Sequence, residues 1–349
     1  MKLGIIGLPQ AGKSTIFAAL TGARGEKDVS KTGKGDRRIG TVKVMDERVD
    51  FLEKLYSPKK TTYARVEYLL PPPAAGGGDG SVSESALWNR VRVCDALIHV
   101  LRNFKTPGGI EPAPEEDFWR LEENMILADL VVAEKRLERI ELDRKRGNPP
   151  NKKEFELLQR AKEMLEMGRP LRADADLSSA QVLRGFTFLS AKPQLLVINN
   201  DDDDESMPDW EKGPEDLESM VVRGRLEMDI AAMQPEEARE FQREFHIETS
   251  ALDRVIQASY RLMKLISFFT VLNDEVRAWT VPEGSTALDG AGAVHSDIQK
   301  GFIRAEVLPF EALKRHGTFQ AAKKAGEVKL EGKEYLIQDG DIIAFRFNL

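Results

Sequence analysis

Short apolar runs alternate along the chain with segments in which apolar residues recur every three or four positions. Strand-like runs fill residues 41–45, 63–70, 93–101 and 194–199, and a helical pattern fills 47–56. Strands that alternate with helical segments are typical of a parallel sheet, and continuous apolar runs indicate strands buried on both faces. The pattern therefore predicts an α/β fold.

A long helical insertion separates the last two of these strands. Residues 116–145 and 152–167 each carry apolar side chains at helical spacing, and the second segment ends at Gly168 and Pro170. Glycine and proline are typical residues at and just beyond the end of a helix. We therefore expect a helical hairpin that projects from the sheet domain.

The turn of this hairpin is strongly basic. Residues 144–153 contain no acidic residue and five cationic ones, namely Arg144, Lys145, Arg146, Lys152 and Lys153. A charged turn is often only a solvated loop, whereas a cationic cluster on a projecting loop is also typical of a contact with phosphate groups. The residues leave both interpretations open.

The first strand leads into a phosphate-binding loop. The string GLPQAGKS at residues 7–14 follows an apolar run and precedes a helical pattern, which is the sequence and the context of a P-loop. Its backbone N–H groups cradle phosphate oxygens, its lysine reaches the β and γ phosphates, and its serine hydroxyl binds Mg²⁺. We predict that Ser14 is a magnesium ligand and that the nucleotide is bound by Gln10, Ala11, Gly12, Lys13, Ser14 and Thr15.

The second half of the magnesium site is missing from its expected place. P-loop proteins commonly add an aspartate from another strand to the P-loop serine. Here the strand-like run ends on Leu70 and continues as PPPAAGGGDG. We therefore expect nucleotide binding to persist, and hydrolysis and switching to be impaired.

Residues suited to contact a base follow the run 194–199. In P-loop GTPases an Asn-Lys-x-Asp motif stands here, and its aspartate pairs with guanine. The segment 199–202 reads Asn199, Asn200, Asp201 and Asp202, so it keeps the first and fourth positions but lacks the lysine. Guanine selectivity is therefore expected to be weak. Further on, Ser250 and Ala251 stand where such proteins bring a backbone amide to the base.

Composition limits the compartment and the partners. The 349 residues are 41% hydrophobic and 31% charged, as is usual for a globular protein of two or three domains. A formal charge of −7 argues against a broad nucleic-acid surface, so we expect no DNA partner and at most a local RNA contact. The single Cys94 forms no internal disulfide, and we find no signal peptide or membrane segment. These features predict a cytoplasmic protein without a membrane partner.

Several longer strings resemble one protein family. DALIHVLRNF and LADLVVAEKRLERIE are similar to the third-strand region and the helical hairpin of the YchF family of Obg-like ATPases. The strongest resemblance is C-terminal, where VRAWTVPEGSTALDGAGAVHSDIQKGFIRAEV and LEGKEYLIQDGDIIAFRFN resemble the TGS domain, a ubiquitin-like β-grasp module.

The resemblance implies a complete domain plan. A G-domain-like P-loop NTPase sheet is expected in residues 1–110 and 190–267, an inserted α-helical hairpin in 111–189, and the TGS domain in 268–349. The family also implies ATP in preference to GTP, association with the ribosome or translation machinery, and Phe104 beside the base.

Departures from the family pattern fall on the metal site. Leu70 takes the position of the Walker B aspartate, and Lys34 that of a magnesium-binding threonine. Glu67 stands three residues too early on the strand to reach the ion, and Asp79 is a remoter substitute. Mg²⁺ is therefore expected to be weakly held, and no catalytic residue is assigned.

These observations favour a translation-associated protein that binds ATP, or else GTP, with weak or absent hydrolysis. Two alternatives stay open, a genuine slow ATPase or GTPase switch and a scaffold that works without nucleotide. A P-loop kinase for small molecules is a more distant interpretation.

Overall fold

The chain divides into two compact units, each described here by itself. The computed structural model describes residues 1–22, 30–31, 38–72, 84–106, 108–149, 151–214, 216–244, 247, 250–272 and 274–348. The first unit comprises Met1–Val42 and Glu67–Val255, and the second comprises Lys43–Val66 and Ile256–Leu349. None of the described helices combines the length and the apolar character that crossing a bilayer requires.

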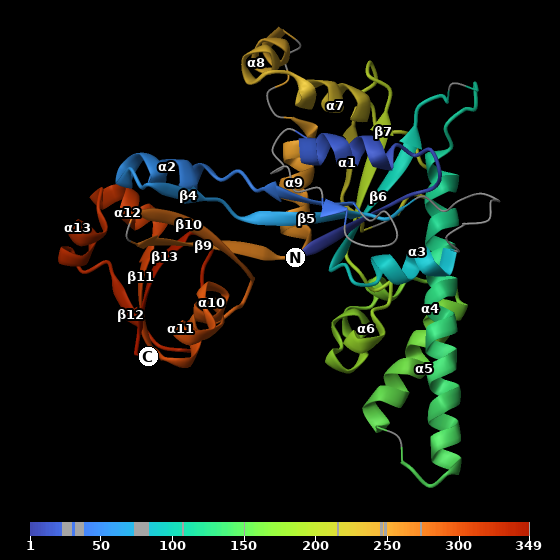
Figure 1. The fold of residues 1–349 in the computed structure, drawn as a ribbon. Helices are drawn as coiled ribbons and strands as arrows, with labels where there is room; N and C mark the ends of the chain where they lie inside the picture. Colours follow the sequence, from blue (N-terminus) through green and yellow to red (C-terminus); the bar gives the residue numbers. More distant parts are fainter. Residues whose placement is uncertain are drawn as a thin grey trace. The chain divides into compact units, whose positions relative to one another are not determined.

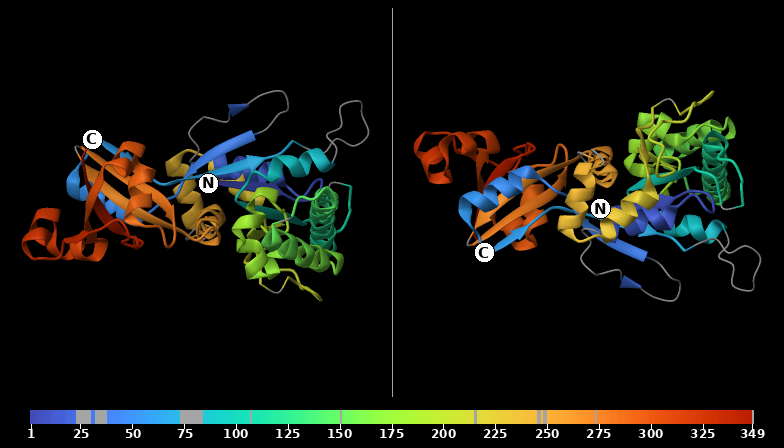
Figure 2. Two further views of the ribbon diagram at one scale, coloured as in Figure 1. Left: turned by 90° about the horizontal axis from the view of Figure 1, so that it is seen from below. Right: turned by 90° about the horizontal axis from the view of Figure 1, so that it is seen from above.

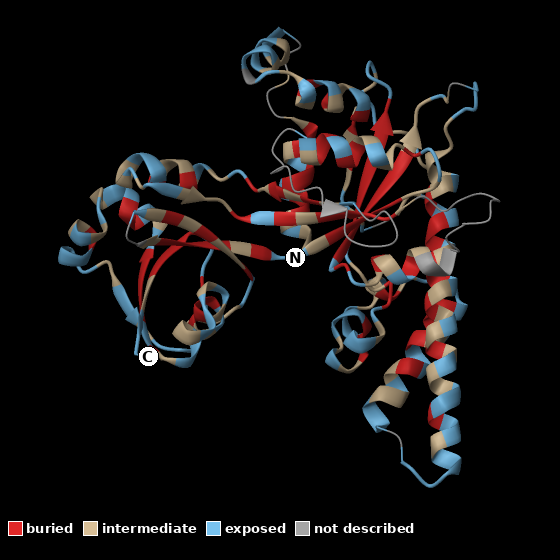
Figure 3. Cartoon of the chain, viewed as in Figure 1, coloured by how far each residue is buried: buried red, intermediate tan, exposed pale blue. Residues whose placement is uncertain are grey.

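Within the described residues, a seven-stranded sheet forms the centre of the first unit (Figure 1). The strand order is β2-β3-β5-β1-β6-β7-β8, and the last five strands of this order pair in parallel. The central strands are buried along most of their length (Figure 3), as their continuous apolar runs predict. The strands are β1 Lys2–Ile6, β2 Ser30–Lys31, β3 Arg38–Lys43, β5 Arg65–Leu70, β6 Ala96–Asn103, β7 Gln194–Asn200 and β8 Ser219–Val222.

Helices and short 3-10 segments cover this sheet. Apolar side chains of α3 and α4 pack against β1 and β6, while α1 and α7 pack against each other. The α-helices are α1 Lys13–Gly22, α3 Glu84–Val91, α4 Pro114–Lys145, α5 Lys152–Glu166, α6 Ala175–Ser179, α7 Gly224–Ala232, α8 Pro235–Glu244 and α9 Ala251–Leu262, and the 3-10 segments are η1 Leu171–Ala173 and η2 Gln181–Phe186.

The parallel pairing brings distant parts of the sequence to one edge of the sheet. Parallel strands have their carboxyl ends on the same side, and this edge is where α/β proteins bind ligands. The P-loop follows β1, Phe104 follows β6, and Asn199 and Asn200 end β7. The predicted α/β P-loop fold is confirmed, and its topology explains why these residues meet.

Helices α4 and α5 form the predicted hairpin and run side by side (Figures 1 and 2). Helix α4 has 32 residues, which corresponds to about 48 Å at 1.5 Å per residue. The shared core contains Ile126 and Ala133 of α4 with Leu158 and Leu165 of α5. The side chain of Asn151 caps α5 by accepting a hydrogen bond from the backbone N–H of Glu154 at 3.2 Å.

A buried ion pair fixes the base of this hairpin to the sheet. Arg92 donates to Asp129 of α4 at 2.8 Å, and the Asp129 side chain is fully buried. The same carboxylate accepts hydrogen bonds from the backbone N–H groups of Leu189 and Ser190 at 3.0 and 2.7 Å. Removing the partner of a buried carboxylate lowers the stability of a protein by about 3–5 kcal/mol. These contacts therefore hold the middle of α4 firmly in place.

The second unit is built on a sheet that, in its described residues, has the strand order β12-β11-β13-β9-β10-β4. Strands β9 and β10 form an antiparallel pair, β13 pairs parallel with β9, and α10 packs on the core that includes Phe268 and Phe302. The elements are β4 Lys60–Thr62, β9 Leu265–Leu272, β10 Glu275–Pro282, β11 Phe302–Pro309, β12 Lys329–Glu331, β13 Asp341–Phe347, α2 Glu47–Tyr56, α10 Ala287–Val294, α11 Ser296–Lys300, α12 Phe310–His316 and α13 Phe319–Lys324. Two sheets agree with the predicted fold class, while the predicted domain bounds and the name TGS for this module stay predictions.

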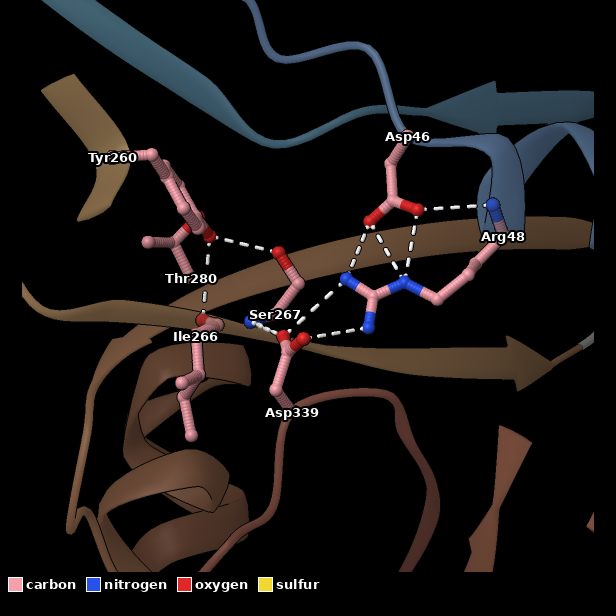
Figure 4. Close-up of polar contacts among 7 residues, drawn as sticks. All are labelled: Asp46, Arg48, Tyr260, Ile266, Ser267, Thr280 and Asp339. Carbon is pink, nitrogen blue, oxygen red and sulfur yellow. Dashed lines mark hydrogen bonds and ion pairs between the residues drawn. The ribbon is translucent and has the colours of Figure 1, made fainter. Parts of the chain in front are cut away.

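Residues 43–66 pack with the C-terminal module, although the sequence analysis placed them in the nucleotide-binding domain. The reason is a charged junction around Arg48, drawn in Figure 4. Its guanidinium donates to Asp46 at 2.8–3.2 Å and to Asp339 at 2.8 and 3.3 Å. Burial alone would lower the pKa of Arg48, but the hydrogen bonds from these two carboxylates outweigh it and raise that pKa.

Candidate functional site

The P-loop can adopt its conformation only because Gly7 and Gly12 have no side chains. A Cβ added to Gly7 would lie 2.4 Å from the carbonyl oxygen of Val100, and one added to Gly12 would lie 2.1 Å from Nδ2 of Asn199. Both glycines have positive φ, at 150° and 89°. The loop therefore packs directly on the ends of β6 and β7, and any side chain at these positions would displace it.

Lys13 lies at the centre of the loop, at the start of α1. Its Nζ donates to the carbonyl oxygens of Gly7 and Leu8 at 2.9 and 2.6 Å. Burial lowers the pKa of Lys13 to about 8. The lysine is therefore held within the phosphate cradle, and it is readily deprotonated in mildly alkaline solution.

The remaining predicted phosphate residues surround Lys13. Ala11 is buried, Ser14 is exposed in the first turn of α1, and Thr15 is half-buried beside it. Gln10 is exposed and adopts a left-handed backbone with φ 65°, a conformation that costs a non-glycine residue about 1–3 kcal/mol. Ser14 is thus accessible to solvent, and its role as a magnesium ligand stays a prediction.

The side chain of Asn199, near the end of β7, connects the P-loop with the start of α7. Its Nδ2 donates to the carbonyl oxygen of Ala11 at 3.2 Å, and its Oδ1 accepts the backbone N–H of Gly224 at 3.0 Å. The side chain is buried, with 4% of its surface exposed. Asn199 therefore holds the P-loop and the start of α7 in place, which is a supporting role that the sequence did not reveal.

The two other candidates after β7 are engaged locally. The Asn200 side chain accepts from Asn103 at 2.9 Å and donates to the carbonyl oxygens of Asp204 and Ser206 at 3.2 and 2.8 Å. Oδ1 of Asp202 accepts the backbone N–H of Leu226 at 3.0 Å. Both side chains therefore shape the loop after β7, and their contact with a base stays a prediction.

Ser250 and Ala251 lie at the start of α9, where Glu227 binds both. The Ser250 hydroxyl donates to Oε2 of Glu227 at 2.7 Å, and the Ala251 backbone N–H donates to Oε1 at 2.8 Å. Glu227 belongs to α7 and is only 5% exposed. The Glu227 carboxylate therefore binds the backbone amide of Ala251, which was predicted to contact the base. No sequence pattern had indicated a role for Glu227.

Phe104 lies beside the P-loop. Its Cε1 is 3.9 Å from the position that a Cβ on Gly12 would take. The ring follows directly on β6 and is half-buried. The structure therefore gathers Phe104, the P-loop and Asn199 in one place, which is consistent with the predicted nucleotide site.

The strand next to the P-loop has no carboxylate at its end. Leu70 ends β5 with 5% of its surface exposed. Glu67 pairs in register with Lys2, and its Oε2 lies 3.5 Å from Lys2 Nζ at the start of β1. Three strand residues span about 10 Å, so Glu67 stands far from the loop that follows β1. Lys34 and Asp79, the other positions considered, lie outside the described residues.

A buried histidine near the P-loop is not suited to catalysis. His99 on β6 is fully buried, and its Nδ1 lies 2.9 Å from Nε2 of Gln194. Burial lowers the pKa of His99 to about 3, so the ring is neutral at physiological pH. It is therefore a core residue of the sheet. A second histidine, His295, caps α11 by accepting the backbone N–H of Asp297 at 3.2 Å.

Comparison with known proteins agrees with this geometry. The chain is 37% identical over 363 residues to the ribosome-binding ATPase YchF of Bacillus subtilis, and the match covers 99% of both chains. It is 34% identical over 361 residues to the protein of the same name from Escherichia coli O157:H7, covering 100% of this chain and 99% of the relative. The chain belongs to the YchF family.

Two further comparisons place this YchF protein within the family. The family model for the C-terminal domain of YchF GTPases, described as a protein of unknown function (DUF933), matches residues 265–348. The solved structure of the YchF GTPase from Schizosaccharomyces pombe superimposes with a TM-score of 0.83 at 26% identity, covering 99% of this chain and 97% of that one. The likeness therefore extends over both units of the chain.

The position of Lys13 makes nucleotide affinity dependent on pH. Phosphates bind the protonated ammonium, and in the free protein the Lys13 pKa is about 8. Below pH 8 the group is already charged, whereas above it each pH unit should weaken ATP binding by up to about tenfold. Isothermal titration of the YchF protein with ATP from pH 7.5 to 9.5 measures this dependence.

Lys13→Arg is the matched control, because arginine keeps its charge throughout this range. Its affinity is expected to be lower but constant between pH 8 and 9.5. Equal slopes for the wild type and the arginine variant would contradict the assignment to Lys13.

Proposed function

We propose that this member of the YchF family is a cytoplasmic, ribosome-associated protein that binds ATP in preference to GTP and has weak or absent hydrolysis. The observation that carries the proposal is the contrast between the two halves of its P-loop site. One half, the loop from Gly7 to Ser14, has the backbone and the lysine needed to bind phosphates. In the other half, β5 ends on the buried Leu70 where a metal-binding carboxylate belongs.

The residues fit a nucleotide better than they fit a firmly held metal. Ser14 supplies one hydroxyl ligand for Mg²⁺, which when bound would neutralise charge on the β and γ phosphates. In the described residues no group of three or more histidine, cysteine, aspartate or glutamate side chains is placed to bind a metal ion. The metal would then depend on Ser14, phosphate oxygens and water, so Lys13 provides the fixed charge at this site.

A preference for ATP follows from the side chains after β7. Guanine recognition needs a carboxylate for the N1 and N2 hydrogens, yet Oδ1 of Asp202 is engaged by the backbone N–H of Leu226. A lysine stem to cover the base is also absent, because Asn200 stands in its place and turns to Asn103. Both features weaken the recognition of guanine, and neither lowers the affinity for adenine.

Association with the ribosome is supported by the relatives and by the hairpin tip. Proteins at 34–37% identity carry the name ribosome-binding ATPase. The five tip cations are Arg144, Lys145, Arg146, Lys152 and Lys153, and all are exposed (Figure 3). The nearest acidic partners, Asp143 and Glu156, lie 3.9 Å from Arg146 and Lys152, too far for tight pairs. A rigid helix pair that carries such a tip is suited to contact ribosomal RNA phosphates.

The two alternatives differ from this proposal in testable ways. A genuine slow ATPase would require a substitute carboxylate, and Glu67 is paired with Lys2 at the other end of the strand. A scaffold that works without nucleotide would not need the positive φ angles and glycines of the P-loop. The measurements below separate all three.

ATP is expected to bind at least as tightly as GTP. The reason is the engaged Asp202 carboxylate and the missing lysine at position 200. Competition of ATP and GTP for a fluorescent nucleotide, with and without Mg²⁺, measures the preference. A clear advantage for GTP would show that Asp202 reads guanine, and no binding of either nucleotide would favour the scaffold.

ATP turnover is expected to be slow and only weakly dependent on Mg²⁺. Loss of one preorganised electrostatic group commonly costs about a hundredfold or more in rate. Leu70→Asp should restore a carboxylate at the end of β5 and increase the effect of Mg²⁺ on ATP affinity, measured by titration at several metal concentrations.

Leu70→Asn is the control for Leu70→Asp, because it has nearly the same shape and no charge. Equal behaviour of the two variants would mean that β5 does not face the metal. Turnover of ATP by the wild type at a rate ordinary for the family, abolished by Glu67→Gln, would establish the slow-ATPase alternative.

Replacing the tip cations should weaken ribosome binding and reduce its salt dependence. Each phosphate contact that is lost removes about 0.7–0.9 from the slope of log affinity against log salt. The triple change Arg144→Ala, Lys145→Ala and Arg146→Ala is measured by co-sedimentation with ribosomes between 50 and 200 mM salt, as an assay range typical for such contacts. The triple change of the exposed residues Lys135, Arg139 and Arg169 to alanine removes the same charge away from the tip, and an equal effect of both would refute the tip contact.

A further inference from the structure

The segment that follows β6, from Phe104 to Glu111, is held by Arg102 and is called here the β6 loop. Arg102 lies near the end of β6, and its Nη1 donates to the carbonyl oxygens of Phe104 and Ile110 at 3.1 and 3.0 Å. Its Nη2 donates to the carbonyl oxygen of Glu111 at 3.1 Å. Because the guanidinium presents its donors in a rigid planar fork, these bonds fix both ends of the β6 loop relative to the strand.

Weaker contacts within the β6 loop add to this arrangement. The backbone N–H of Thr106 donates to the carbonyl oxygen of Ile110 at 3.2 Å, and the N–H of Ile110 donates to the Thr106 hydroxyl at 3.2 Å. Lys105 and Glu111 form an exposed ion pair at 2.8 Å. Exposed ion pairs contribute little to stability, so the loop depends mainly on Arg102 and on its own backbone.

The β6 loop brings the ring of Phe104 to the P-loop. Its Cε1 lies 3.9 Å from the position that a Cβ on Gly12 would take, and the ring is half-buried. Asn103, between Arg102 and Phe104 in the chain, donates to the Asn200 side chain at 2.9 Å. The end of β6 is therefore joined to the end of β7, and Phe104 lies beside the phosphate cradle.

We propose that Arg102 is a positioning residue for the nucleotide base. By fixing the β6 loop, it holds the Phe104 ring where the ring packs on the base of a nucleotide whose phosphates occupy the P-loop. The inference rests on the proposed function, because it requires ATP in this site. Every base has a flat face on which an aromatic ring can pack, so the contact adds affinity for the base without selecting adenine over guanine.

The contribution of Arg102 is to order the loop before the nucleotide binds. A loop that becomes ordered only on binding lowers the affinity, because its conformational freedom is lost in that step. Here the three bonds from Arg102 order both ends of the β6 loop in the protein without nucleotide. The Phe104 ring is therefore in place when the base arrives.

Two other roles fit Arg102 less well. A direct contact with the nucleotide phosphates would need donors that face the P-loop, whereas both Nη atoms of Arg102 donate to carbonyl oxygens of the β6 loop. A contact with ribosomal RNA would need an exposed guanidinium like those of the hairpin tip, whereas Arg102 is half-buried.

The test compares the binding of ATP with that of inorganic tripolyphosphate, which has the phosphates but no base, by isothermal titration of the full-length protein. Arg102→Ala should weaken ATP binding by about tenfold, the loss expected when one stacking contact of a base is removed, and should leave tripolyphosphate binding unchanged. Phe104→Ala should have the same two effects. The double variant should bind ATP no more weakly than either single variant, because both changes remove the same contact.

Two further variants complete the test. Arg120→Ala is the matched control, because Arg120 is an exposed arginine on α4 outside the β6 loop. Arg102→Lys is a milder change that keeps the test valid if Arg102→Ala does not fold. It keeps the charge but has one nitrogen where the guanidinium uses two, so it should recover little of the ATP affinity and should bind tripolyphosphate as the wild type does.

Four results would overturn the inference. They are a loss of tripolyphosphate affinity in the Arg102 variants as large as the loss for ATP, additive effects of Arg102→Ala and Phe104→Ala, full ATP affinity of Arg102→Lys, and an effect of Arg120→Ala equal to that of Arg102→Ala. The wild type separates this inference from the proposed function. If it binds neither ATP nor tripolyphosphate, the proposed nucleotide binding is refuted, whereas equal affinity for both ligands would refute only the contact with the base.

Discussion

The hydrogen bonds of the Asn199 side chain are the constraint on which the candidate site depends. One amide group at the end of β7 donates to the P-loop at Ala11 and accepts from the start of α7 at Gly224. The fit is so close that a Cβ on Gly12 or Gly224 would overlap the Asn199 side chain at 2.1 or 2.6 Å. Asn199 stands in the sequence where P-loop GTPases have a motif that contacts the base. In the structure its side chain holds the P-loop to the start of α7.

The same edge of the sheet contains a site of two unequal halves. The backbone geometry of the P-loop is set by glycines, and the charge of Lys13 is tuned by burial. The adjacent strand, β5, is apolar to its end, and its one acidic residue is paired with Lys2 at the opposite end. Phosphate binding depends on the first half and metal-assisted hydrolysis on both, which is the basis of the proposal that the site favours binding over turnover.

The second unit shows how a segment distant in sequence becomes part of a module. Asp46 and Asp339 hold the Arg48 guanidinium from two sides (Figure 4), and its carbon lies 5.2 Å from the centre of the Phe269 ring. This junction fixes α2 and β4 to the C-terminal sheet.

The sequence by itself determined most helices and strands and the chemistry of residues that are neighbours along the chain. The P-loop, helix α2 at residues 47–56, the hairpin helices and the C-terminal module all follow from apolar periodicity, glycine spacing or longer strings, which are properties of neighbouring residues. The predicted strand 63–70 corresponds to β5 at 65–70, whereas β4 at 60–62, which no apolar run indicated, pairs with β10, more than two hundred residues away. Tertiary structure alone decided that Glu227 binds Ser250 and Ala251, that Asp202 is engaged by α7, and that Arg48 joins residues 43–66 to the C-terminal module. These contacts join residues between 23 and 291 positions apart, and the pattern of neighbouring residues contains no information about which distant partner a side chain will meet.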